Sequence, residues 1–202
     1  MKKIIFAAAA LFAFGFANAQ DTEATGGAMG FANGDIFITG SVGFNSSKTG
    51  DFKTNSFDIS PSVGFFVTDN IAIGGRLGFT STKEDDGFGD DVTSDTFRIG
   101  AFGRYYATPA SQFSMFVELG ANYMSTTEND GTGAEDFKTT GFGIALAPGV
   151  SYWIADNWAL EASIAALSYN TSKPDVDGAE NTNDFGLNVD LTNINIGIVY
   201  KF

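Results

Sequence analysis

Residues 113–123 read Phe-Ser-Met-Phe-Val-Glu-Leu-Gly-Ala-Asn-Tyr, and an apolar side chain occupies every second position from Phe113 to Tyr123. Alternation with a period of two predicts a β-strand with one apolar face. The stretch is eleven residues long, which is within the about 9–11 residues that a tilted strand needs to cross a bilayer.

The same alternation recurs in seven other stretches of nine or eleven residues, 36–44, 57–65, 71–79, 97–105, 142–152, 158–166 and 194–202. The connections between successive stretches hold 12, 5, 17, 7, 18, 5 and 27 residues, so long and short connections alternate. That pattern is typical of an up-and-down barrel with all its short turns at one end. We therefore predict an all-β fold, an eight-stranded antiparallel up-and-down transmembrane β-barrel over residues 35–202.

An internal repeat supports the strand count. Residues 61–73 (Pro-Ser-Val-Gly-Phe-Phe-Val-Thr-Asp-Asn-Ile-Ala-Ile) align without a gap on residues 148–160 (Pro-Gly-Val-Ser-Tyr-Trp-Ile-Ala-Asp-Asn-Trp-Ala-Leu). Asp-Asn in each copy suits a tight turn. Pro61 and Pro148 fall inside predicted strands, where proline interrupts the hydrogen-bond ladder, so we expect a local bulge at each.

The charged residues of the strands all lie on the face opposite the apolar stripe. An arginine that faces lipid at the bilayer midplane costs about 2–4 kcal/mol, so this face must point into the barrel. Four bases and four acids in a narrow interior predict paired, hydrogen-bonded ions, and we expect that interior to exclude large aromatic side chains. The predicted lumen ion pairs are drawn from Asp58, Arg76, Arg98, Arg104, Glu118, Glu161, Asp190 and Lys201.

Aromatic residues stand at the ends of many stripes. Such positions are typical of the two interfacial girdles of a membrane barrel, although aromatics also favour strands in general. The predicted girdle consists of Phe57, Phe65, Phe97, Tyr105, Phe113, Tyr123, Phe142, Tyr152 and Trp158.

The N-terminus has the pattern of an export signal. Lys2 and Lys3 precede an apolar run over residues 4–16, and Ala-Asn-Ala follows at 17–19. These features predict a signal peptide over residues 1–19, cleaved after Ala19. The small and polar residues 20–34 then predict a flexible segment. Cleavage would remove Lys2 and Lys3 and no acid, which changes the net charge from −13 for the full chain to −15 for the predicted mature chain.

The composition excludes several classes of function. The chain has no His and no Cys, which removes the commonest general base, the thiolate nucleophile and most zinc sites. Its 11 Lys and Arg stand against 24 Asp and Glu, which argues against a nucleic-acid partner. We predict no catalysis and no cofactor.

The long connections are the acidic part of the chain. Apart from Asp190, which we assign to the lumen, they carry 15 acids and 5 lysines, a net charge of −10. Residues 84–91 and 175–178 place carboxylates beside glycine, but neither meets the calcium-loop spacing. We therefore expect solvated loops and no metal site. The loop sequences identify no extracellular partner.

Together these features resemble the small outer-membrane β-barrel proteins of the OmpA and OmpX kind. The resemblance rests on the export signal, the eight amphipathic strands, the paired aromatics at 65–66, 105–106 and 152–153, and the alternating C-terminal strand. It implies an outer-membrane location, a lipid environment, and delivery by periplasmic chaperones to the barrel-assembly machinery. In that family the C-terminal aromatics, here Tyr200 and Phe202, form the assembly signal.

The resemblance is specific for architecture and leaves the activity open, because such barrels serve several functions. We expect a structural or surface-interaction role with a lumen largely filled by ion pairs. The alternative is a narrow, porin-like channel for small or hydrophobic solutes.

Overall fold

The computed structural model describes residues 29–85, 87, 91–131, 135–187 and 194–202. No helix in these ranges is long and apolar enough to cross a membrane. The regular elements are the strand segments β1 (Ile36–Thr49), β2 (Phe52–Phe66), β3 (Ile71–Asp85), β4 (Val92–Tyr106), β5 (Phe113–Asn129), β6 (Phe137–Trp153), β7 (Trp158–Ser163), β8 (Leu167–Pro174), β9 (Thr182–Leu187) and β10 (Asn195–Lys201).

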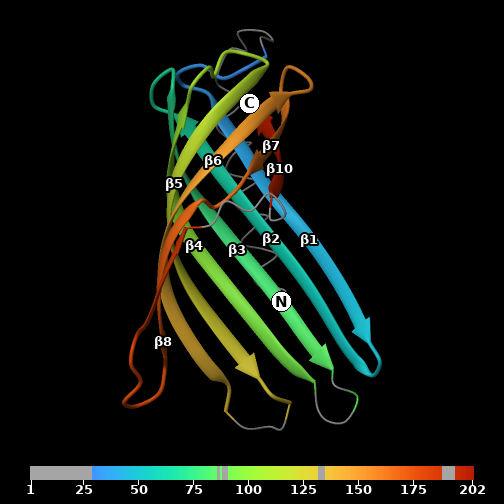
Figure 1. The fold of residues 1–202 in the computed structure, drawn as a ribbon. Coiled ribbons are helices and arrows are strands. Elements are labelled where there is room, and N and C mark those ends of the chain that lie inside the picture. The colour runs from blue at the N-terminus through green and yellow to red at the C-terminus, as the bar shows by residue number, and fades with distance from the viewer. Residues whose placement is uncertain (1–28, 86, 88–90, 132–134, 188–193) are drawn as a thin grey trace.

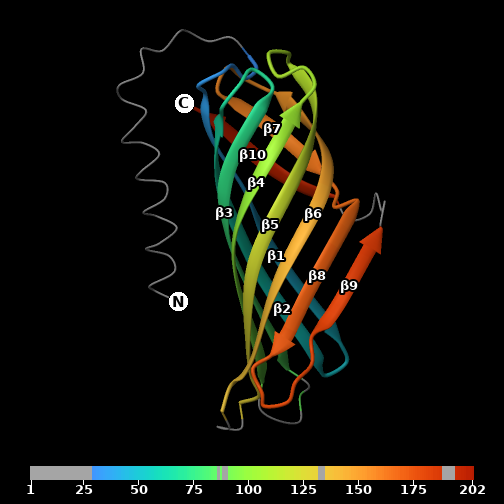
Figure 2. The same cartoon turned by 90° about the vertical axis from the view of Figure 1, so that its left-hand side faces the viewer.

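These segments form a barrel of eight antiparallel strands (Figures 1 and 2). Segments β1 to β6 pair in chain order. Strand β6 pairs with both β7 and β8, which together make the seventh strand. Segments β9 and β10 make the eighth by pairing with β8 and β7. The ring closes where β10 pairs with β1, which confirms the predicted fold.

The strands are longer than their apolar stripes. Segments β1 to β6 have 14 to 17 residues, so much of each predicted long connection continues as strand. The connection from β1 to β2 shrinks to Gly50 and Asp51, where Gly50 adopts a positive φ of 63°. We call the end with this turn the outer end. The turns over 67–70, 107–112 and 154–157 lie at the opposite, short-turn end, as does the C-terminus (Figure 1).

Both strand prolines interrupt the ladder to the following strand. Strand β2 pairs with β3 up to Ile59 and again from Ser62, in the same register on both sides of Pro61. At Pro148 the register of β6 changes by one residue between β7 and β8, because residues 164–166 face only 147–148. The expected bulge therefore occurs at Pro148, whereas Pro61 breaks the ladder without an extra residue.

The internal repeat produces equivalent turns. The side-chain amide of Asn70 donates a 2.8 Å hydrogen bond to the carbonyl of Tyr106. The amide of Asn157, its counterpart, donates a 2.8 Å bond to the carbonyl of Lys201. Each asparagine thereby ties a short turn to the end of a neighbouring strand.

The apolar stripe faces outward. On β5, Val117 and Leu119 are 42% and 56% exposed, whereas Phe116 and Glu118 between and beside them are 3% and 7% exposed. The buried core therefore lies inside the barrel, and it gathers toward the short-turn end.

Candidate functional site

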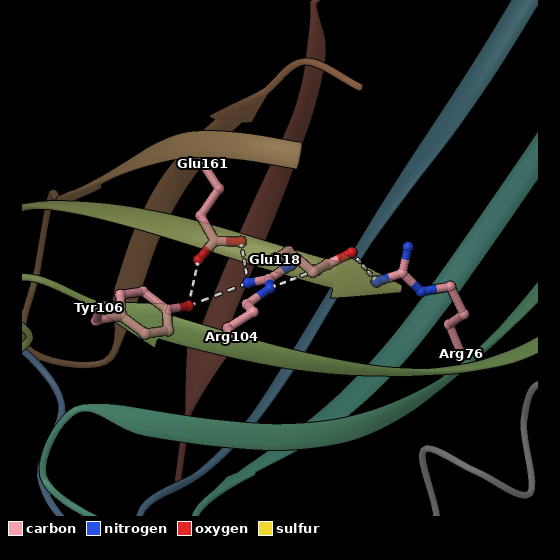
Figure 3. A network of polar contacts seen from close by, with 5 residues as sticks. All are labelled: Arg76, Arg104, Tyr106, Glu118 and Glu161. Atoms are coloured by element: carbon pink, nitrogen blue, oxygen red, sulfur yellow. Dashed lines mark hydrogen bonds and ion pairs between the residues drawn. The ribbon is translucent and has the colours of Figure 1, made fainter. Parts of the chain in front are cut away.

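A network of five side chains crosses the lumen near the short-turn end (Figure 3). At its centre Arg104 donates from Nε to Glu118 Oε2 at 2.6 Å and from Nη1 to Glu161 Oε2 at 2.8 Å. Glu118 also accepts a bond from Arg76. The hydroxyl of Tyr106 donates to Glu161 Oε1 at 3.0 Å and accepts from Arg104 Nη1 at 3.1 Å. We call these five residues the lumen network.

The alternation of the strands places this network inside. Arg104 and Tyr106 are two residues apart on β4 and therefore share the inward face. Glu118 of β5 is the register partner of Arg104, so their side chains meet directly across the ladder. Arg76 and Glu161 reach the same point from β3 and β7. The guanidinium of Arg104 thus links β4, β5 and β7, and Arg76 joins β3 to them through Glu118.

Aromatic rings surround that guanidinium. The guanidinium carbon of Arg104 lies 4.7 Å from the ring centre of Phe116 and 5.1 Å from that of Phe102. The corresponding carbon of Arg76 lies 4.8 Å from Phe102. Cation–π contact of this kind compensates part of the cost of burying the charge. The charges of the network are therefore hydrogen-bonded and stacked rather than isolated.

A layer of rings closes the lumen between the network and the short turns. Phe31, in the segment before β1, stacks on Phe66 with centroids 4.5 Å apart and meets Trp153 edge-on at 4.8 Å. The N–H of Phe31 donates to the carbonyl of Pro109, which fixes the segment across the barrel end. Every ring of this layer is at most 3% exposed. We call it the aromatic plug, and it consists of Phe31, Phe37, Phe66, Tyr106, Phe116 and Trp153.

The plug corrects the expectation that the interior excludes large aromatics. In each paired aromatic at the end of an even-numbered strand, the first ring faces out and the second faces in. Phe65 is 43% exposed while Phe66 is 0% exposed, and the pairs at 105–106 and 152–153 behave alike. Glycines on neighbouring strands make room for other inward rings. Gly64, Gly74 and Gly149 are the register partners of Phe37, Phe102 and Phe116, and each ring lies where a Cβ on its glycine would be.

Lys201 lies on the inward face of β10. Its ammonium donates to the carbonyl of Gly30 at 2.6 Å, lies 3.7 Å from Asp35 Oδ2 and sits 5.0 Å from the ring of Trp153. The C-terminal strand is thus tied to the segment that carries Phe31. That segment falls within residues 20–34, for which the sequence predicts flexibility. Residues 1–28, and the predicted signal peptide with them, lie outside the described residues.

The other predicted lumen charges lie nearer the outer end. Arg98 donates to Thr80 Oγ1 at 2.9 Å, and no carboxylate of the described residues lies within ion-pairing distance of it. Asp58 likewise forms no ion pair there, and its carboxylate covers Gly43. Asp190 lies outside the described residues. The structure therefore gathers Arg76, Arg104, Glu118 and Glu161 into one network and leaves Arg98 and Asp58 apart from it.

The predicted girdle residues are all on the outer surface. Their exposed fractions run from 37% for Phe97 to 56% for Tyr105. Tyr123 is the register partner of Phe142, and Phe113 is that of Tyr152, so these rings form neighbouring pairs on the wall. At the C-terminus the ring of Tyr200 packs 4.8 Å from Trp158 and 5.0 Å from Phe202. The nine girdle residues form two groups. Those toward the outer end are Phe57, Phe97, Tyr123 and Phe142, and those toward the short turns are Phe65, Tyr105, Phe113, Tyr152 and Trp158.

Sequence reasoning missed Tyr106 and Asp35 as partners of the lumen charges, and it missed Phe31 as part of the aromatic plug. The inward position of Tyr106 could have been predicted, because Tyr106 is two residues from Arg104 on the same strand and so faces the same side. Phe31 and Asp35 precede the first stripe, where alternation gives no guidance. In chemical terms the lumen network holds charges in fixed pairs and contains no activated nucleophile. Among the described residues no three ligating side chains gather into a metal site.

The comparison with known families agrees with this architecture. The sequence profile of the outer membrane protein beta-barrel domain matches residues 6–202. The chain therefore belongs to the outer membrane protein beta-barrel domain family, and it is an outer-membrane protein that sits in the lipid bilayer. No curated protein sequence matches the chain.

Solved structures share the fold at low sequence identity. OprG from Pseudomonas aeruginosa is 15% identical, with a TM-score of 0.54 over 86% of this chain and 98% of OprG. Neisserial surface protein A is 18% identical, with a TM-score of 0.51 over 83% of this chain and 97% of that protein. At these identities the likeness concerns the barrel itself.

Proposed function

We propose that this chain is a non-conducting, non-enzymatic outer-membrane barrel with a structural or surface-interaction role. One observation carries the proposal: the lumen network and the aromatic plug together fill the barrel at its short-turn end. In bacterial outer-membrane barrels short turns face the periplasm. A plug at that end separates the outer part of the lumen from the periplasm.

The surface available for contact lies at the outer end. Apart from Asp190, the predicted long connections carry a net charge of −10, so a basic protein surface or bridging cations suit this end. No catalytic role is proposed, because the buried acids Glu118 and Glu161 are both engaged by Arg104 and the chain has no histidine to serve as a base.

Assembly follows the family pattern in this proposal. Tyr200 and Phe202 end the alternating C-terminal strand, and the carbonyl of Lys201 between them is held by Asn157. We expect periplasmic chaperones to deliver the chain and the barrel-assembly machinery to read this strand. A Phe202→Ala variant should accumulate outside the membrane fraction, whereas Phe65→Ala, which removes a lipid-facing ring elsewhere, should insert.

Planar-bilayer recording of the refolded chain tests the central proposal. We expect no steady conductance, because the plug and the network pack the lumen at the short-turn end. A steady pore that is lost when Arg76 or Glu118 is replaced would instead support the alternative, a narrow porin-like channel for small or hydrophobic solutes. Heat-dependent mobility on a gel should accompany folding, as in other barrels of this class.

A further inference from the structure

A cavity of about 290 Å³ occupies the lumen on the outer side of the network. Arg104, Glu118 and Glu161 form its floor, and Arg98 with Asn122 borders it farther along β4 and β5 toward the outer end. The cavity is separate from the aromatic plug, because no ring of the plug lines it.

Two arginines face this cavity from adjacent strands. Arg98 is the register partner of Gly78, which is two residues along β3 from Arg76. The two arginine side chains are therefore diagonal neighbours on one face. Arg98 uses Nη1 for Thr80. The Nε of Arg76 is buried and has no hydrogen-bond partner among the described residues. Arg76 is already paired with Glu118, whereas Arg98 has no carboxylate partner among the described residues. The uncompensated positive charge that an added anion would meet is therefore that of Arg98, beside the Arg76 guanidinium.

The rest of the lining suits a polar, negatively charged guest. Three arginines and two glutamates line the cavity, a net charge of +1 by 3 − 2. Hydroxyl and amide groups add donors that can turn toward an anion. These are supplied by Thr39, Ser41, Ser60, Ser62, Asn122 and Ser163.

We propose that this cavity is a binding site for a small organic monoanion that enters from the outside, with its carboxylate between Arg76 and Arg98. A planar carboxylate matches the fork of a guanidinium. The connections at the outer end are acidic and disfavour guests of higher negative charge. The ligand is a dissolved molecule rather than a lipid headgroup, because the cavity lies inside the barrel wall.

The test is a titration of the refolded full mature chain with 4-fluorobenzoate, followed by ¹⁹F NMR. We expect saturable binding, at least tenfold weaker binding to Arg98→Gln, and no binding of the neutral analogue 4-fluorobenzamide. Lys53→Gln is the matched control, because it removes the same charge from an exposed site on β2. It should bind within twofold of the unmodified chain.

A second variant guards against misfolding of Arg98→Gln. A Cβ on Gly120 would meet Glu118 Oε1 at 3.5 Å and Arg76 Nη1 at 4.0 Å, which are ordinary contacts. Gly120→Leu should therefore fill the cavity, keep every charge and abolish binding. Equal affinity of Arg98→Gln and Lys53→Gln, or no binding to the unmodified chain, would overturn the proposal. Binding seen only in Asp190→Asn would also overturn it, because the chain's own carboxylate would then occupy the site.

Discussion

Along the inward face of β4, Ser94, Thr96 and Arg98 are half-buried, whereas Phe102, Arg104 and Tyr106 are fully buried. The two groups belong to one continuous strand, and they differ in what fills the lumen beside them. Rings and paired ions pack the short-turn end, while hydroxyls and an open cavity line the outer part. The barrel wall is thus uniform, and the lumen contents determine which end is closed.

The comparison predicts that the same substitution, Arg to Met, destabilises the barrel much more at the short-turn end than toward the outer end. In Arg104→Met, Glu118 keeps only Arg76 as a partner, and Glu161 keeps only the hydroxyl of Tyr106. Because a buried ion pair is broken, the free energy of unfolding should fall by about 3–5 kcal/mol. Arg98→Met, on the same strand, removes one hydrogen bond to Thr80 and should cost about 1 kcal/mol. Reversible urea unfolding in lipid vesicles measures both. Equal losses would show that the ends do not differ in this way.

The aromatic plug provides the second contrast. Phe31→Ala removes a ring that is 2% exposed and touches four other rings, so the free energy of unfolding should fall by about 3 kcal/mol. Phe65→Ala, on the lipid face, is the control and should cost about 1 kcal/mol or less. We also expect Phe31→Ala to remain non-conducting, because the lumen network lies behind the plug. A steady pore in this variant would assign the closure to Phe31 alone.

Most of the wall could be predicted from the sequence, because a period of two specifies both the strand and its face. The inward placement of Arg76, Arg104, Glu118 and Glu161 followed from parity together with the cost of charge in lipid. The same parity put Phe66, Tyr106 and Trp153 inside, but an estimate of lumen width argued against large rings there. That estimate ignored the glycines on neighbouring strands, such as Gly64, which leave room for an inward ring beside them.

The pairing of the charges could not be predicted in the same way. Parity states which face a residue occupies, whereas pairing depends on the stagger of eight strands around a closed ring. Arg104 meets Glu118 through direct register, but it meets Glu161 only because β4 and β7 approach across the lumen. Asp35 and Phe31 precede the first strand, so nothing in the alternation connects them to Lys201 or to the plug.

The internal repeat allows a comparison within the short-turn end. Asn70→Ala and Asn157→Ala each remove one 2.8 Å bond from a side-chain amide to a strand carbonyl, and each should cost about 1 kcal/mol. Because Asn157 holds the carbonyl of Lys201 on the closing strand, its loss should also slow refolding into vesicles. A refolding rate equal to that of Asn70→Ala would argue against this special role.

The smallest effect is expected at the outer end, where Lys83 of β3 forms an ion pair with Asp91. Both side chains are substantially exposed, so Asp91→Asn should leave the unfolding free energy unchanged within error. The pair should still be visible in titration, because the hydrogen bond and charge of Asp91 raise the pKa of Lys83 above its ordinary value of 10.5.

A raised pKa in the folded state means that any stabilisation by this pair is complete below the ordinary lysine value and is lost as the pH rises through the folded pKa. NMR titration of the Lys83 side chain should therefore show its midpoint falling toward 10.5 in Asp91→Asn. An unchanged midpoint would show that Lys83 and Asp91 are not paired in solution. A measurable loss of stability would mean that the outer end is more tightly packed than the contrast with the plug implies.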